Sequence, residues 1–120
     1  MVKIILSGCN GRMGKVISKL ANTIEDVSIV AGIDRNTEKS NYPIFASISD
    51  CNISADVILD FSRPDALDSL IEYGKENNIG IVFCTTGYSD EQIKKINDLS
   101  KILPIFRSAN MSIGINVVNN

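Results

Sequence analysis

Short apolar runs alternate with longer amphipathic stretches along this chain, and this alternation restricts its fold more than any other feature. Runs of strand length are expected at Val2–Ser7, Val27–Ile33, Ala55–Phe61, Ile79–Cys84 and Leu103–Arg107, with a weaker candidate at Pro43–Ala46. Strands that are apolar on both faces are typical of a sheet that is covered by helices on both sides. We therefore expect an α/β fold with a doubly wound parallel sheet.

Three helices are expected between these strands, at Arg12–Thr23, at Pro64–Asn77 and from Ser89 onward. The first helix carries an apolar stripe of Met13, Ile17, Leu20 and Ile24, and the third a stripe of Ile93, Ile96 and Leu99. The second and third helices each begin with a pair of residues that resembles a capping box, Ser62 with Asp65 and Ser89 with Gln92.

Composition excludes several classes of function. The chain has 120 residues, a net charge of −2 and no His, so neither a basic nucleic-acid surface nor a zinc site of mixed ligands is expected. No apolar run approaches the roughly 18 residues of a membrane span. We expect a cytoplasmic protein with three reduced cysteines and no metal. Because the commonest general acid/base is absent, no catalytic residue is predicted in this chain.

A glycine-rich turn is the strongest motif. Gly8, Gly11 and Gly14 form G-C-N-G-R-M-G between the first strand and the first helix, which is the context that a dinucleotide pyrophosphate site requires. Gly8 allows the sharp turn, Gly11 allows the backbone to approach the pyrophosphate, and Gly14 allows close packing of the helix. The phosphates would meet free N–H groups at the positive end of the helix dipole.

Asp34 and Arg35 follow the second strand and predict contacts to a ribose. Asp34 lies 20 positions after Gly14 (34 − 14), close to where dinucleotide-binding folds carry an acidic ribose ligand. Its carboxylate would accept hydrogen bonds from both ribose hydroxyls of NAD and would repel a 2′-phosphate. Arg35 would attract that phosphate. The pair therefore predicts that both NADH and NADPH are accepted.

Three further polar segments follow strands and are expected at the same edge of the sheet. They are Asp60–Pro64, Cys84–Gly87 and Ser108–Gly114. Hydroxyls, an amide and small residues at one edge suit a nicotinamide ring, whose carboxamide needs a donor and an acceptor. Turns are rich in such residues in any protein, so the prediction rests on their convergence with the glycine turn.

Taken in order, G-x-x-G-R-M-G, D-F-S-x-P, T-T-G and A-N-x-S-I-G-I-N resemble the dihydrodipicolinate reductases of bacterial lysine (diaminopimelate) biosynthesis, over the first part of the family's length. The resemblance implies a Rossmann-like NAD(P)-binding domain over residues 1–120. It implies that Gly8, Cys9, Asn10, Gly11, Arg12 and Met13 hold the pyrophosphate, and that Asp34 and Arg35 lie at the adenosine ribose. It places Cys84, Thr85, Thr86, Ser108, Ala109, Asn110 and Met111 at the nicotinamide, with Phe61 and Arg63 flanking the cofactor.

The resemblance also implies an oxidoreductase that reduces 4-hydroxy-tetrahydrodipicolinate with NAD(P)H. In that family a second domain holds the small dicarboxylate substrate, so the chain is expected to be a fragment of a longer, homo-oligomeric enzyme and to be inactive alone. Two alternatives remain open from the sequence. One is another two-domain dehydrogenase of the aspartate or homoserine type, which a G-x-x-G-x-x-G turn would also suit. The other is a non-catalytic nucleotide-sensing module.

Overall fold

A single parallel sheet organises the part of the chain that the computed structural model describes, residues 1–37 and 41–107. Its six strands, in the spatial order β3-β2-β1-β4-β5-β6, all pair in parallel. They are β1 (Val2–Ser7), β2 (Val27–Ile33), β3 (Ile44–Phe45), β4 (Val57–Asp60), β5 (Gly80–Phe83) and β6 (Ile105–Arg107). The parallel α/β sheet expected from the sequence is confirmed, including the short strand near Pro43.

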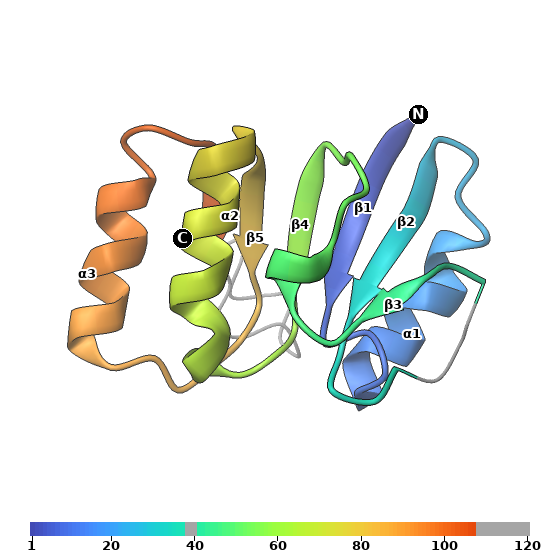
Figure 1. Ribbon diagram of the computed structural model, residues 1–120, viewed down its shortest axis with the longest axis horizontal. Helices are drawn as coiled ribbons and strands as arrows, with labels where there is room; N and C mark the ends of the chain where they lie inside the picture. Colours follow the sequence, from blue (N-terminus) through green and yellow to red (C-terminus); the bar gives the residue numbers. More distant parts are fainter. Residues whose placement is uncertain (38–40, 108–120) are drawn as a thin grey trace, which may run out of the picture.

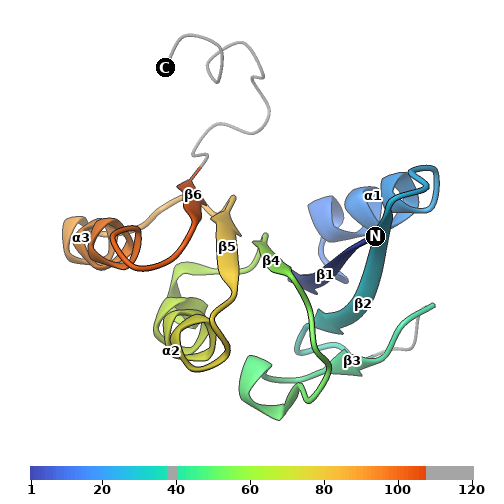
Figure 2. The same cartoon turned by 90° about the horizontal axis from the view of Figure 1, so that it is seen from above.

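The helices cover both faces of this sheet. Helix α1 (Arg12–Ala21) lies on one face, whereas α2 (Leu67–Asn77) and α3 (Asp90–Leu99) lie on the other (Figures 1 and 2). Two short 3₁₀ turns, η1 (Ile48–Asp50) and η2 (Pro64–Ala66), complete the connections. The strand order reverses direction between β1 and β4, and in such sheets ligands bind beyond the carboxyl ends of the strands at that reversal.

The larger core lies between the sheet and helices α2 and α3. It joins strand residues such as Ile5, Ile58 and Ile81, all fully buried, to helix residues such as Leu67 and Leu70. A smaller cluster of Leu6, Cys9 and Tyr42 forms on the face that α1 covers. Consecutive strand residues thus serve opposite faces, and each fully buried aliphatic side chain stabilises the fold by roughly 1.5–3 kcal/mol.

Helix α1 contacts the sheet through small residues rather than through its whole apolar stripe. Gly14 and Ala21 are buried, whereas Met13 and Leu20 are 42% and 52% exposed. The reason is the close approach at Gly14, where an added Cβ would lie 2.2 Å from the carbonyl oxygen of Gly8. This contact turns the glycine side of the helix toward the sheet and leaves the larger side chains on its outer surface.

The two expected capping boxes have opposite outcomes. At α3 the Ser89 hydroxyl accepts the N–H of Gln92 and the Gln92 side chain accepts the N–H of Ser89, so this prediction is confirmed. The capping box predicted at Ser62 and Asp65 is wrong, because no side chain caps η2 or α2 within the described residues. The Ser62 hydroxyl donates to Asp60, and Asp65 forms an ion pair with Arg35. Both side chains have distant partners in the fold, which removes them from any cap of η2 and α2.

Among the described helices, none has the length and apolar character needed to cross a membrane. The three cysteines, Cys9, Cys51 and Cys84, are unpaired as expected.

Candidate functional site

The three glycines of the first turn have different surroundings. Gly8 adopts a φ of +83°, and a Cβ there would lie 2.8 Å from the carbonyl carbon and oxygen of Phe61, so the turn rests directly on the backbone that follows β4. Gly14 packs against the backbone of Gly8 and Cys9. At Gly11, by contrast, a Cβ would meet only one atom of the described part of the chain, the carbonyl oxygen of Gly8, at 3.3 Å. Gly8 and Gly14 therefore shape the turn, while Gly11 borders open space.

Within residues 1–37 and 41–107, no side chain caps the N-terminus of α1. Gly11 is the N-cap residue, and no acidic residue lies in the first turn of the helix. Arg12 begins the helix instead, although a cation is unfavourable at the positive end of a helix dipole. Helix α3 shows the usual solution, with a capping box and Asp90 and Glu91 in its first turn. The contrast indicates that the first N–H groups of α1 are suited to an external anion.

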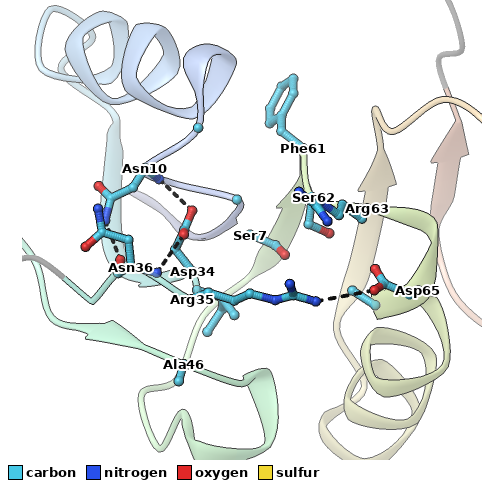
Figure 3. Close-up of a pocket in the computed structure, with 14 residues that line it drawn as sticks. Ser7, Asn10, Asp34, Arg35, Asn36, Ala46, Phe61, Ser62, Arg63 and Asp65 are labelled. Atoms are coloured by element: carbon cyan, nitrogen blue, oxygen red, sulfur yellow. Dashed lines mark hydrogen bonds and ion pairs between the residues drawn. The ribbon is translucent and has the colours of Figure 1, made fainter.

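Asp34 joins the end of β2 to the glycine turn. One carboxylate oxygen accepts the backbone N–H of Asn10 at 3.0 Å, and the other accepts the backbone N–H of Asn36 at 3.0 Å (Figure 3). The Asn10 side chain in turn donates to the carbonyl of Asn36 at 2.6 Å. Since an ionised carboxylate can accept about four hydrogen bonds, Asp34 retains capacity for hydroxyls of a ligand.

A cavity of about 610 Å³ lies between the glycine turn, the end of β2 and the loop after β4. Its volume falls in the range typical of small-molecule sites, about 300–1,000 Å³. Its position is the one that the strand reversal between β1 and β4 predicts. The residues that line it are Ser7, Gly8, Asn10, Gly11, Ile33, Asp34, Arg35, Asn36, Ala46, Phe61, Ser62, Arg63, Asp65 and Ala66.

The cavity brings together five of the residues that the sequence indicated as cofactor ligands: Gly8, Asn10, Gly11, Asp34 and Arg35. It also includes Phe61 and Arg63, which were expected to flank the cofactor. Among the other residues assigned to the pyrophosphate, Cys9 does not line the cavity, because its side chain is 1% exposed and packs with Leu6 and Tyr42. Burial, and then the charge of Asp34, raise the pKa of Cys9 to about 11. Arg12 and Met13 are exposed at the start of α1.

Sequence reasoning missed several of the lining residues. Ser7 and Ile33 end β1 and β2, so the rule that ligands bind at strand ends could have identified them. Asp65 carried a signal too, as an acidic residue directly after the D-F-S-R-P segment, but it was assigned to a helix cap. Ala46 follows β3, and the chain pattern there was too weak to place it.

A buried carboxylate ties the loop after β4 to the loop after β5. Asp60 is 0% exposed and accepts hydrogen bonds from the Ser62 N–H at 3.0 Å, the Ser62 hydroxyl, the Thr85 hydroxyl at 3.3 Å and the Tyr88 hydroxyl at 3.2 Å. Burial, and then the charge of Asp60, raise the pKa of Tyr88. The sequence placed Asp60 in one of the polar segments at the edge of the sheet, without a role of its own. In the structure its carboxylate links the loops that follow β4 and β5.

Of the residues predicted for the nicotinamide side, Cys84, Thr85 and Thr86 are described; they follow β5 and are not among the residues that line the cavity. Thr85 is 6% exposed and its hydroxyl faces Asp60 and the carbonyl of Ser62. Cys84 is half-buried, and burial followed by the charge of Asp60 raises its pKa to about 11. Thr86 is exposed. Ser108, Ala109, Asn110 and Met111 lie outside the described residues.

No group of three His, Cys, Asp or Glu side chains suited to a metal ion occurs within residues 1–37 and 41–107.

Comparison with known proteins identifies the family to which the chain belongs. Residues 2–111 match the model of the family described as "Dihydrodipicolinate reductase, N-terminus". The chain belongs to this family. A curated relative, the 4-hydroxy-tetrahydrodipicolinate reductase of Clostridium novyi, is 62% identical over 121 residues, which cover 100% of this chain and 48% of the relative. The chain thus spans about half the length of the curated relatives it matches.

Solved structures agree with this assignment. A dipicolinate-bound dihydrodipicolinate reductase from Paenisporosarcina sp. TG-14 superposes with a TM-score of 0.83 at 25% identity, covering 98% of this chain and 50% of that chain. A homoserine dehydrogenase from S. aureus gives a TM-score of 0.69 at 18% identity, over 90% of this chain and 32% of that one. The second likeness shows only the shared Rossmann-like fold, so the homoserine-type alternative has no further support.

Proposed function

We propose that this chain is the part of a 4-hydroxy-tetrahydrodipicolinate reductase that binds NADH or NADPH. The observation that carries the proposal is the cavity at the strand reversal, bordered by the open side of Gly11 and by an uncapped helix N-terminus. Free N–H groups, a helix dipole and a glycine without a side chain are the features that a pyrophosphate requires.

The residues present fit the parts of a nicotinamide dinucleotide. Gly11, Arg12 and the first N–H groups of α1 would hold the pyrophosphate. Asp34 would accept the hydroxyls of the adenosine ribose, and Arg35 would pair with a 2′-phosphate where one is present. Cys84, Thr85 and Thr86, with Ser108, Ala109, Asn110 and Met111, are proposed for the nicotinamide side. The bound cofactor supplies hydride, and this chain supplies binding and orientation.

The substrate half of the reaction is proposed to lie outside these 120 residues. A dicarboxylate needs fixed cationic partners, and the arginines that line the cavity, Arg35 and Arg63, lie where the cofactor is proposed to bind. The rest of the enzyme, in a cytoplasmic homo-oligomer, would provide that pocket. Positioning of substrate against cofactor can account for roughly 7–11 kcal/mol of a reaction barrier, so the chain alone is expected to turn over many orders of magnitude more slowly.

The test combines a binding assay with a turnover assay on the 120-residue chain. NADH is titrated by its fluorescence, and oxidation of NADH is then followed by absorbance at high protein concentration with freshly generated substrate. Saturable binding without turnover is the expected result. Absence of NADH binding by the folded chain would refute the proposed function. Robust oxidation that survives repurification would instead refute the division of labour between this chain and the rest of the enzyme.

A further inference from the structure

Arg35 reaches across the cavity to a residue from the opposite wall. Arg35 follows β2, whereas Asp65 belongs to η2, after β4. A terminal guanidinium nitrogen of Arg35 lies 3.5 Å from a carboxylate oxygen of Asp65, and both residues line the cavity (Figure 3). The pair therefore joins the side of the cavity that carries Asp34 to the side that carries the loop after β4.

Asp65 differs from Asp34 in what holds it. Both oxygens of Asp34 accept backbone N–H groups, so its position is fixed by the turn and by β2. The side chain of Asp65 contacts Arg35, and the two side chains are 65% and 80% exposed. A pair so exposed to water is weak and can be broken by a competing anion. Asp65 therefore orients the Arg35 guanidinium through a weak ion pair that a ligand can displace.

We propose that Asp65 sets how well this site accepts a 2′-phosphate, by holding Arg35 toward the far wall of the cavity. This inference rests on the proposed function and adds a specificity determinant to it. A phosphate on the ribose has to draw the Arg35 guanidinium away from Asp65 before the two can pair. A ribose with a free 2′-hydroxyl has no such requirement, because Asp34 alone can accept its hydrogen bonds. The ion pair therefore favours NADH over NADPH.

The size of the effect follows from the exposure of the pair. Exposed ion pairs contribute little, so release of Arg35 alone is expected to change NADPH affinity by up to about fivefold. Removing the negative charge of Asp65 near the phosphate acts in the same direction, which gives an expected gain of about three- to tenfold. NADH affinity should change by less than about twofold. The gain should shrink with added salt, because charges exposed to water are screened over about 8 Å at physiological ionic strength.

The experiment measures the dissociation constants of NADH and NADPH for four variants: Asp65→Asn, Arg35→Gln, the double variant and Asp68→Asn. Asp68 is the matched control, since it forms a similar exposed ion pair with Lys95 at 3.1 Å and does not line the cavity. Asp65→Asn should shift the affinity ratio toward NADPH by about three- to tenfold, and Arg35→Gln should shift it toward NADH. Without Arg35, the Asp65 substitution should shift the ratio by clearly less than it does in its presence, because only the direct effect of its charge remains. Asp68→Asn should leave the ratio unchanged.

An unmoved ratio in a folded Asp65→Asn protein that still binds NADH would overturn this inference and leave the proposed function intact. A shift that persists in full without Arg35 would also overturn it, because Asp65 would then act through its own charge. Binding of neither nucleotide by the wild-type chain would instead remove the proposed function, and this inference with it. Melting temperatures of all variants, compared with wild type, identify any loss of affinity that comes from unfolding.

Discussion

Substitution of Gly14 by Ala tests the packing that creates the site. The new methyl carbon would lie 2.2 Å from the carbonyl oxygen of Gly8 and 2.7 Å from two backbone atoms of Cys9. Contacts between such atoms normally exceed about 3.4 Å, so α1 and the turn would have to separate by about 1 Å. The atoms in conflict all belong to the backbone, and no side chain can rotate to relieve them. The turn and the first helix should therefore lose their native contact.

The expected magnitude is the difference between two effects. Overpacking of this kind typically costs about 1–3 kcal/mol and can cost more, whereas Ala in place of a helical Gly contributes about 1 kcal/mol in the opposite direction. Because the clash with Gly8 is severe, we expect a net loss of about 2 kcal/mol in the free energy of unfolding. For a domain of this size that corresponds to a fall in Tm of roughly 6–12 °C.

Urea denaturation followed by circular dichroism measures this loss, and Gly11→Ala is the matched control. It makes the same substitution in the same turn, but its methyl carbon meets only one atom, at 3.3 Å, and its φ of −75° suits any residue. The control should lose less than about 0.5 kcal/mol, as do most substitutions without a buried contact. A Gly14→Ala protein as stable as wild type would refute the close helix packing described above.

Three other predictions concern individual side chains. Asp60→Ala should lower the free energy of unfolding by roughly 2–4 kcal/mol, because Asp60 is fully buried and its loss leaves the partly buried donors of Ser62 and Tyr88 without their acceptor. A loss below about 1 kcal/mol by urea denaturation would count against the Asp60 cluster. Asp34→Ala should move the ratio of NADH and NADPH affinities about tenfold toward NADPH, since it removes charge-assisted hydrogen bonds to the ribose and a charge that repels the 2′-phosphate. A ratio that stays constant in titrations would make Asp34 a purely structural residue. Stability should fall as pH rises from about 9 to about 11, because burial keeps Cys9 and Cys84 protonated in the folded state up to a pKa of about 11, whereas the thiols of the unfolded chain have their ordinary pKa of 9.0. A urea midpoint that stays constant or rises over that interval, compared between wild type and Cys84→Ser, would contradict the burial of these thiols.

Local patterns were sufficient to predict the sheet and the glycine turn. Apolar runs and helical stripes report burial over a few residues, and the spacing from Gly14 to Asp34 reflects the length of the first helix and the strand that follows it. The Ser89 cap could be predicted for the same reason, because all of its partners lie within one turn of helix.

Features that depend on distant partners could not be predicted in this way. Ser62 looked like a helix cap, but Asp60 and Thr85 engage it in a cluster that only the pairing of β4 with β5 assembles. Asp65 pairs with Arg35 because the residues that follow β2 and β4 lie at the same edge of the sheet. The exposed stripe on α1 has a local cause instead: the approach of Gly14 to the turn decides which side of the helix faces the sheet, and a periodic apolar pattern does not report that contact.

The most direct test of the account is calorimetric titration of NADH into the wild-type chain and into Gly11→Val. Position 11 borders the cavity, its φ of −75° suits any residue, and a Cβ there would meet only the carbonyl oxygen of Gly8 among the described residues. The fold should therefore survive, while the branched side chain occupies the space through which a pyrophosphate must approach the backbone. We predict saturable binding by wild type and a more than roughly tenfold weaker affinity for Gly11→Val at a near-native Tm. Equal NADH affinity of the two folded proteins would contradict the claim that this turn holds the cofactor.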